Sequence, residues 1–166
     1  MTVALRPALP SDEGFLRDLI VDTIAGELGA SAWPEPMRSH LLGLQYTARR
    51  HSSRVDFPEA MSQVIQANGK DSGWVLVNAM HHEVRVIEIM VAPELRGKGI
   101  GTAVIRDLLA SASRTGKPMR LSVNITNSGA IRLYERLGFR RIDGNEVQHI
   151  MEAPPDQVEA LCPSSR

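Results

Sequence analysis

Residues 91–102 read Val-Ala-Pro-Glu-Leu-Arg-Gly-Lys-Gly-Ile-Gly-Thr. The segment 84–91 is almost continuously apolar, which is typical of a strand buried on both faces, and Pro93 ends that strand. Apolar residues at helical spacing follow from about Gly99 to Ser113. A buried strand, a glycine-rich turn and an amphipathic helix therefore succeed one another, which predicts an α/β protein.

The glycine-rich turn has the composition of a pyrophosphate-binding loop. Its glycines allow a tight turn and let an anion approach the backbone without meeting a Cβ atom. The following helix start offers free N–H donors and partial positive charge, and Arg96 and Lys98 add two formal charges. A Walker A loop requires Gly-Lys-Ser/Thr, and a dinucleotide fingerprint requires glycine in place of Thr102. Neither class of nucleotide-phosphate enzyme fits.

The remaining elements follow from apolar spacing and turn residues. Strands are predicted at residues 2–6, 61–66, 74–78, 84–91, 119–124, 139–142 and 147–152. Helices are predicted to begin near Asp12 and Glu35 and to span 99–113 and 127–137, whereas the polar segment 51–58 is expected to be a loop. This order predicts a mixed sheet in which the strands on either side of the third helix are parallel.

Three short signals fix local geometry. Asn68-Gly69 predicts a hairpin turn because both residues tolerate positive φ. Asn127 is placed to cap the last helix, and Gly138 supplies the left-handed residue that ends it.

Length, net charge and the distribution of apolar residues limit the kinds of partner and location to be expected. The 166 residues are expected to form one domain over 1–153, followed by a tail at 154–166. With 19 basic and 19 acidic residues the formal net charge is zero, so no nucleic-acid or membrane partner is expected. Cys162 is the single cysteine, and neither a signal peptide nor an 18-residue apolar run is present. We therefore expect a cytoplasmic protein.

Two motifs resemble those of one family. Residues 96–101, Arg-Gly-Lys-Gly-Ile-Gly, resemble the coenzyme A loop of the GNAT (GCN5-related) N-acetyltransferase superfamily. Residues 127–139 are similar to its second signature, Asn-x-x-Ala-x-x-x-Tyr-x-x-x-Gly-Phe. Residues 3–8 look like its first strand, and 41–51 resemble an uncharacterised bacterial subgroup. The resemblance implies the GNAT fold: a mixed, mostly antiparallel sheet of six to seven strands with a central splay, flanked by about four helices.

The resemblance also implies a role for each motif residue. Backbone groups of 89–91 would bind the pantetheine arm, the amides of 97–102 would hold the pyrophosphate, and Asn127 would contact the pantetheine. Tyr134 would act as general acid toward the departing thiolate. The implied acetyl-CoA-binding residues are Ile89, Met90, Val91, Arg96, Gly97, Lys98, Gly99, Ile100, Gly101, Thr102, Asn127, Ala130 and Tyr134.

Glu88 is the candidate base. It interrupts an apolar strand, where an unpaired buried charge would be costly, and members of the family often carry an acid at this place. Glu88, directly or through water, would help remove the proton from the attacking amine. The alternative is a carboxylate on a solvated face of the sheet. An unpaired N–H at Met90 or Val91 is the candidate oxyanion donor.

The implied function is transfer of an acetyl group from acetyl-CoA to a primary amine of a small molecule or peptide. Relatives that acetylate protein N-termini often have glutamate where Ser122 stands, which argues against that acceptor class. A non-catalytic acyl-CoA-binding sensor or interaction module is the alternative. His81-His82 has no partner cluster with ligand spacing, so no metal is expected. Dimers are common in the family, so the resemblance allows a homodimer, and no sequence feature decides the oligomeric state.

Overall fold

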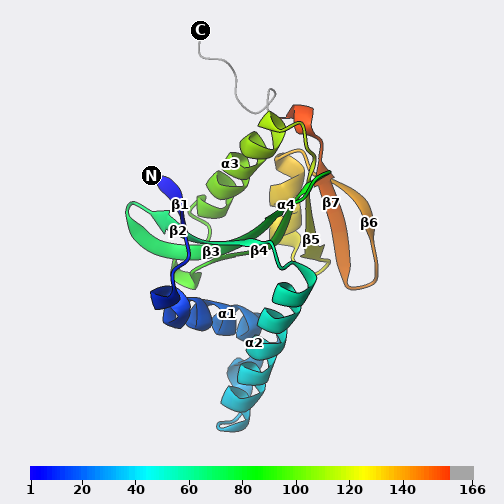
Figure 1. The fold of residues 1–166 in the computed structure, drawn as a ribbon. Helices are drawn as coiled ribbons and strands as arrows, with labels where there is room; N and C mark the ends of the chain where they lie inside the picture. The colour runs from blue at the N-terminus through cyan, green and yellow to red at the C-terminus, as the bar shows by residue number, and fades with distance from the viewer. Residues whose placement is uncertain (158–166) are drawn as a thin grey trace. The chain divides into compact units, whose positions relative to one another are not determined.

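The computed structural model describes residues 1–157, so Cys162 and most of the expected tail lie outside the described residues. Within this range the chain forms seven strands and four α-helices (Figure 1). The strands are β1 (Val3–Pro7), β2 (Met61–Ala67), β3 (Lys70–Ala79), β4 (Val84–Val91), β5 (Met119–Asn124), β6 (Arg140–Gly144) and β7 (Gln148–Ala153). The helices are α1 (Glu13–Glu27), α2 (Met37–Asp56), α3 (Ile100–Arg114) and α4 (Ser128–Arg136).

The strands form one mixed, mostly antiparallel sheet in the order β1-β2-β3-β4-β5-β7-β6. β4 and β5 are parallel, with Val84–Val86 paired to Met119–Leu121, and α3 connects them. β5 and β6 both run antiparallel to β7. The predicted fold class, the element order and the parallel pairing of the strands on either side of α3 are confirmed.

The chain divides into two compact units. The first comprises residues 1–76 and 88–100, and the second comprises, among the described residues, 77–87 and 101–157. β3 and β4 each contribute residues to both units.

Helices α1 and α2 pack against each other in the first unit. α1 buries one stripe at helical spacing, made of Leu16, Leu19, Ile20 and Ile24. α2 buries only Leu42 and Tyr46, whereas the stripe of Met37, Leu41 and Leu44 is exposed.

The prediction of a loop over 51–58 is wrong, because α2 continues to Asp56. No glycine or proline interrupts this segment before Pro58, and the polar residues His51, Ser52, Arg54 and Asp56 are exposed. The helix ends where Phe57 donates its N–H to the carbonyl of Ser53. Pro58 then restricts the preceding residue to extended backbone.

The turn at Asn68-Gly69 is confirmed. Both residues take positive φ, 50° and 77° respectively. The side chain of Asn68 also accepts a hydrogen bond from the backbone N–H of Thr2, which ties the hairpin to β1.

Gly73 on β3 is required by a close approach of two strands. A Cβ atom at this position would lie 2.3 Å from the carbonyl oxygen of Met90 and 3.2 Å from Cα of Val91. The neighbouring N–H of Ala92 donates to the carbonyl of Ser72 at 2.9 Å. Position 73 therefore sets the distance between β3 and the end of β4 that leads into the glycine-rich loop.

We expect Gly73→Ala to destabilise the fold by about 2 kcal/mol or more, because backbone atoms must move to admit the methyl group. Gly43→Ala on α2 is the matched control, since a Cβ there meets nothing within 4 Å. That control should be neutral or stabilise by up to about 1 kcal/mol through helix propensity. Urea unfolding of both variants measures the difference, and equal stabilities would contradict the close approach.

The second unit buries the carboxylate of Glu83, which no sequence pattern singled out. The Glu83 side chain is 2% exposed and lies between two arginines, with Arg85 Nε at 2.8 Å and Arg120 Nη1 at 2.8 Å. Arg120 also pairs with Glu152 of β7 at 2.6 Å. Burial of Glu83 is compensated by this ion-pair network, which joins the start of β4 to β5 and β7.

Candidate functional site

The glycine-rich loop has the conformation that its sequence predicts. Gly97 and Gly99 take positive φ, 73° and 82° respectively, and α3 begins at Ile100. A Cβ atom at Gly97 or Gly101 would meet no other atom within 4 Å, so open space lies beside the backbone at both positions. Backbone amides at the first turn of a helix beside open space suit the phosphates of coenzyme A.

Arg96 links the loop to β4. Its Nε donates a hydrogen bond to the carbonyl of Val91 at 3.0 Å, across the short turn Pro93–Leu95. The residue is exposed, as is Lys98. Arg96 therefore supports the loop in addition to contributing a positive charge.

Strand β4 is less buried than its apolar sequence predicts. Met90 is 4% exposed, but Ile89, Val91 and Glu88 are only half-buried. The prediction that the strand is buried on both faces is therefore wrong for the C-terminal end of β4, residues 88–91.

Glu88 is held by an arginine of α2 in a two-pronged ion pair. Arg49 Nε lies 2.7 Å from Glu88 Oε1, and Arg49 Nη2 lies 2.8 Å from Glu88 Oε2. Arg49 Nη1 in turn contacts Glu27 of α1 at 2.9 Å. The carboxylate of Glu88 is therefore paired, and its side chain is largely shielded from solvent.

Burial acts to lower the pKa of the Arg49 guanidinium, but hydrogen bonds and charge from Glu88 outweigh it and raise the pKa above its ordinary value. Arg49 stays charged as a result, and it holds both oxygens of Glu88 in a fixed orientation. The sequence did not reveal this pairing, because 39 residues separate the two side chains.

The second predicted motif lies on α4, within the second unit. Asn127 Oδ1 accepts a hydrogen bond from the N–H of Ala130 at 3.1 Å, which confirms the N-cap. Gly138 follows the helix with φ 88°, also as predicted. Asn127 is exposed and Ala130 is half-buried. Their contacts with coenzyme A stay predictions.

Tyr134 is 7% exposed, and its ring lies 5.6 Å from that of Phe139, tilted by 58°. Burial raises the pKa of Tyr134 to about 12. The phenol therefore keeps its proton at neutral pH, which is the state that a general acid requires.

Two further predicted features can be placed. Ser122 is exposed on β5. Within residues 1–157 no group of three or more His, Cys, Asp or Glu side chains has the arrangement of a metal site. In the same range, no helix combines the length and apolar character needed to cross a membrane.

The glycine-rich loop and the α4 motif both fall inside a family match. The model of the acetyltransferase (GNAT) family matches residues 26–139. An uncharacterized N-acetyltransferase of Methanocaldococcus jannaschii is 42% identical over 84 residues, covering 46% of this chain and 37% of that protein. The ribosomal protein bS18-alanine N-acetyltransferase of Escherichia coli is 30% identical over 98 residues, covering 52% of this chain and 66% of that protein. The matched stretches thus span less than two thirds of either relative.

The fold has close counterparts among solved structures. The PaiA N-acetyltransferase of Thermoplasma acidophilum, solved in complex with coenzyme A, superposes with a TM-score of 0.69 at 18% identity. That superposition covers 93% of this chain and 99% of the other. The match of the family model to residues 26–139 and the similarity in fold point to the same family. The chain belongs to the acetyltransferase (GNAT) family.

Proposed function

We propose that the protein is an acetyl-CoA-dependent N-acetyltransferase that acts on a primary amine of a small molecule or peptide. The observation that carries the proposal is the glycine-rich loop at the start of α3, with its two positive-φ glycines and open space at Gly97 and Gly101. Acetyl-CoA would supply an activated thioester there, so the amine can attack directly and no covalent enzyme nucleophile is required.

In this proposal the residues of the chain bind and orient acetyl-CoA, and they transfer the protons of the reaction. Amides of residues 97–102 hold the pyrophosphate, and backbone groups of 89–91 hold the pantetheine arm. Tyr134, protonated at neutral pH, donates to the departing sulfur. Asn127 contacts the pantetheine while it caps α4.

Two observations bear on the chemical class of the acceptor amine. One relative is named as an alanine N-acetyltransferase of ribosomal protein bS18, which favours including short peptides among the acceptors. Ser122, where N-terminal acetyltransferases often have glutamate, favours a different amine. We therefore propose a small-molecule amine as the preferred acceptor of the acetyl group and a short peptide as the second candidate.

A thiol-release screen tests this function. The full chain is mixed with acetyl-CoA and panels of amino acids, polyamines, aminoglycosides and short peptides, including one that begins with alanine. Coenzyme A release that depends on one panel supports the enzyme. Tight acetyl-CoA binding without release from any panel would instead favour a non-catalytic acyl-CoA-binding module.

The role of Glu88 as base is tested by Glu88→Gln, which preserves shape while it removes the carboxylate charge. We expect turnover at neutral pH to fall roughly 10- to 100-fold. Activity should recover partly at high pH, because free amine becomes abundant as the pH approaches an alkylamine pKa near 10. The pH profile of turnover from about pH 6 to 9 measures this.

Glu27→Gln is the matched control, because it removes the other carboxylate partner of Arg49 and leaves Glu88 in place. Its profile should follow the wild type. Superposition of the Glu88→Gln and wild-type profiles would remove Glu88 from proton transfer and leave water in that role.

A further inference from the structure

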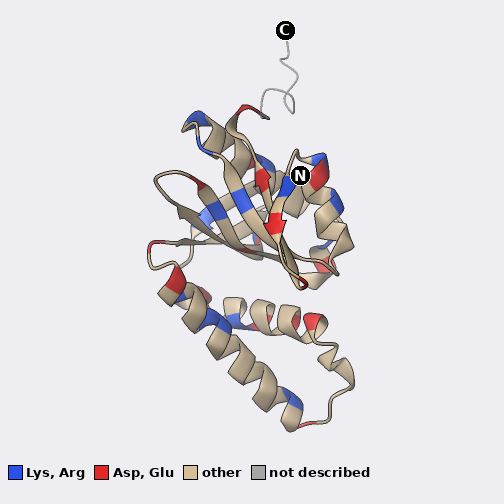
Figure 2. Cartoon of the chain, turned by 90° about the vertical axis from the view of Figure 1, so that its right-hand side faces the viewer, with Lys and Arg blue, Asp and Glu red and all other residues tan. Residues whose placement is uncertain are grey.

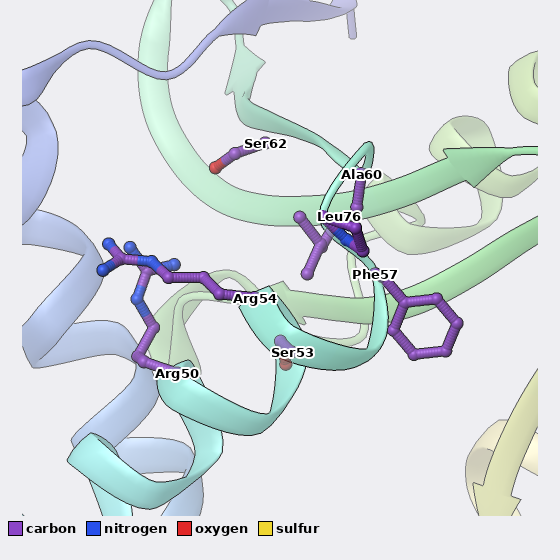
Figure 3. A pocket seen from close by; sticks show the side chains of 8 residues that line it. Arg50, Ser53, Arg54, Phe57, Ala60, Ser62 and Leu76 are labelled. Carbon is purple, nitrogen blue, oxygen red and sulfur yellow. The ribbon is translucent and has the colours of Figure 1, made fainter.

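A pocket of about 290 Å³ lies in the first unit, between the C-terminal half of α2 and strands β2 and β3 (Figure 3). Its polar side is formed by Arg50, Ser53, Arg54 and Ser62. Its apolar side is formed by Leu76 of β3 and by Phe57, Pro58 and Ala60, which join α2 to β2. None of the residues assigned to coenzyme A binding lines it, and none of its lining residues is acidic.

Arg50 is fixed before any ligand arrives. Its guanidinium lies 5.6 Å from the centre of the Trp74 ring, a cation–π arrangement, and its side chain is 17% exposed. Glu13 is its nearest carboxylate at 3.5 Å, and that carboxylate also accepts the hydroxyl hydrogen of Tyr46. The charge of Arg50 is therefore only partly neutralised, and little side-chain entropy remains to be lost on binding.

Arg54 and Ser62 add donors to the same pocket. Within residues 1–157 no carboxylate lies within ion-pair distance of Arg54. Ser62 Oγ accepts the indole N–H of Trp74 at 2.8 Å, which leaves the hydroxyl hydrogen of Ser62 to be donated. Figure 3 shows the side chains of Arg50 and Arg54 extending from α2 in the same direction.

Figure 2 shows positions of basic residues, coloured blue on the ribbon, along this part of α2. Arg49 is paired with Glu88 and Glu27, and Arg50 is partly neutralised by Glu13 at 3.5 Å. The positive charge left for a ligand is therefore that of Arg54 and the remaining part of that of Arg50. A concave site lined by charge of one sign concentrates the field on an entering anion.

We propose that this pocket binds a small carboxylate with a short apolar side chain. The carboxylate would accept hydrogen bonds from Arg50 and Arg54, whose planar guanidinium groups match its geometry. The alkyl part would pack against the apolar lining residues Leu76, Phe57, Pro58 and Ala60. The volume of about 290 Å³ is close to the lower end of the usual range for small-molecule sites, which suits a small ligand.

A carboxylate fits better than a phosphate for two reasons. About half of the lining is apolar, and inorganic phosphate has no group to place against it. The carbonyl end of α2 also carries partial negative charge, which opposes a doubly charged ion more than a singly charged one. Because that partial charge opposes any anion, both guanidinium groups are needed for binding.

The test is a titration of the nitrogen-15-labelled full chain with isocaproate, followed by amide chemical shifts. We expect saturable shifts at Ser53, Phe57 and Ser62. Three comparison ligands separate the contributions: isohexylamine has the same branched chain with a cation, acetate has the carboxylate without the chain, and phosphate is the other anion. The amine should give no saturable shifts, and acetate and phosphate should bind more weakly than isocaproate.

Arg54→Gln should weaken isocaproate binding about tenfold or more, because one charged donor is lost. Arg38→Gln is the matched control on the same helix, since Arg38 does not line the pocket, and it should bind as the wild type does. Circular dichroism verifies that both variants fold.

Equal shifts with isohexylamine, or wild-type affinity in Arg54→Gln, would overturn the proposal. Tighter binding of phosphate than of isocaproate would overturn the carboxylate assignment. These measurements detect binding alone, so the outcome is independent of the acetyl-transfer activity.

Discussion

Replacing Gly101 by valine is expected to weaken acetyl-CoA binding about 100-fold or more. Gly101 is the second residue of α3, and a Cβ atom there enters open space without touching the protein. Valine would fill that space and keep the pyrophosphate away from several backbone donors at once. Each hydrogen bond from a donor to a charged group contributes about 1.5–3 kcal/mol, so the loss of two reaches this magnitude. Calorimetric titration with acetyl-CoA measures it.

Gly14→Val is the matched control for Gly101→Val. Gly14 is likewise the second residue of a helix, α1, and a Cβ there also meets nothing within 4 Å. Both variants therefore carry a similar helix-propensity cost, but only Gly101→Val should lose affinity. Gly99→Val is less informative, because φ of 82° at Gly99 would strain valine regardless of any ligand.

Arg96→Ala gives the contrast within the loop. It removes one solvent-screened charge and the hydrogen bond from Arg96 to Val91, and it leaves the amides in place. We expect a much smaller loss of affinity than in Gly101→Val. Wild-type affinity in Gly101→Val would refute pyrophosphate binding at the start of α3.

Among the features that the sequence predicted correctly, several are specified within a few residues. The positive φ at Asn68 and Gly69, the cap at Asn127 and the left-handed Gly138 each depend on the conformational range of one residue. The loop at the start of α3 belongs to the same class, because glycines and a following amphipathic run determine it together.

The features that the sequence could not reveal depend on distant residues. Arg49 and Glu88 come together only when the tertiary fold brings this part of α2 to β4, and the charge pattern of α2 alone fits a solvated face equally well. Glu83 is buried because two arginines from different strands neutralise it. The length of α2 was also missed, because polar residues without glycine or proline are compatible with both helix and loop.

Tyr134→Phe is expected to lower turnover about 10- to 1000-fold while the Michaelis constant for acetyl-CoA changes little. The ring and its contact with Phe139 are preserved, so packing should be intact. With a pKa of about 12 the phenol is a weaker acid than an ordinary thiol, whose pKa is about 8.5. Donation to the sulfur therefore requires that burial raise the pKa of the departing thiol too, as apolar surroundings do for a neutral acid that becomes an anion on ionising.

Tyr46→Phe is the matched control, because the chain has two tyrosines and the Tyr46 hydroxyl donates to Glu13 within the first unit. Its turnover should equal that of the wild type. An unchanged turnover number in Tyr134→Phe, with chemistry rate-limiting, would remove Tyr134 from the mechanism.

The pH dependence of stability provides an independent check on the burial of the Tyr134 hydroxyl. Burial raises the pKa of Tyr134 from 10.0 to about 12, so between these values the unfolded chain has lost a proton that the folded chain retains. The stabilisation is complete below pH 10 and is lost as the pH rises toward 12. The free energy of unfolding of the wild type should therefore fall more steeply over this interval than that of Tyr134→Phe. Parallel curves would show that the hydroxyl is exposed to water, and the apolar surroundings invoked for proton donation would be absent.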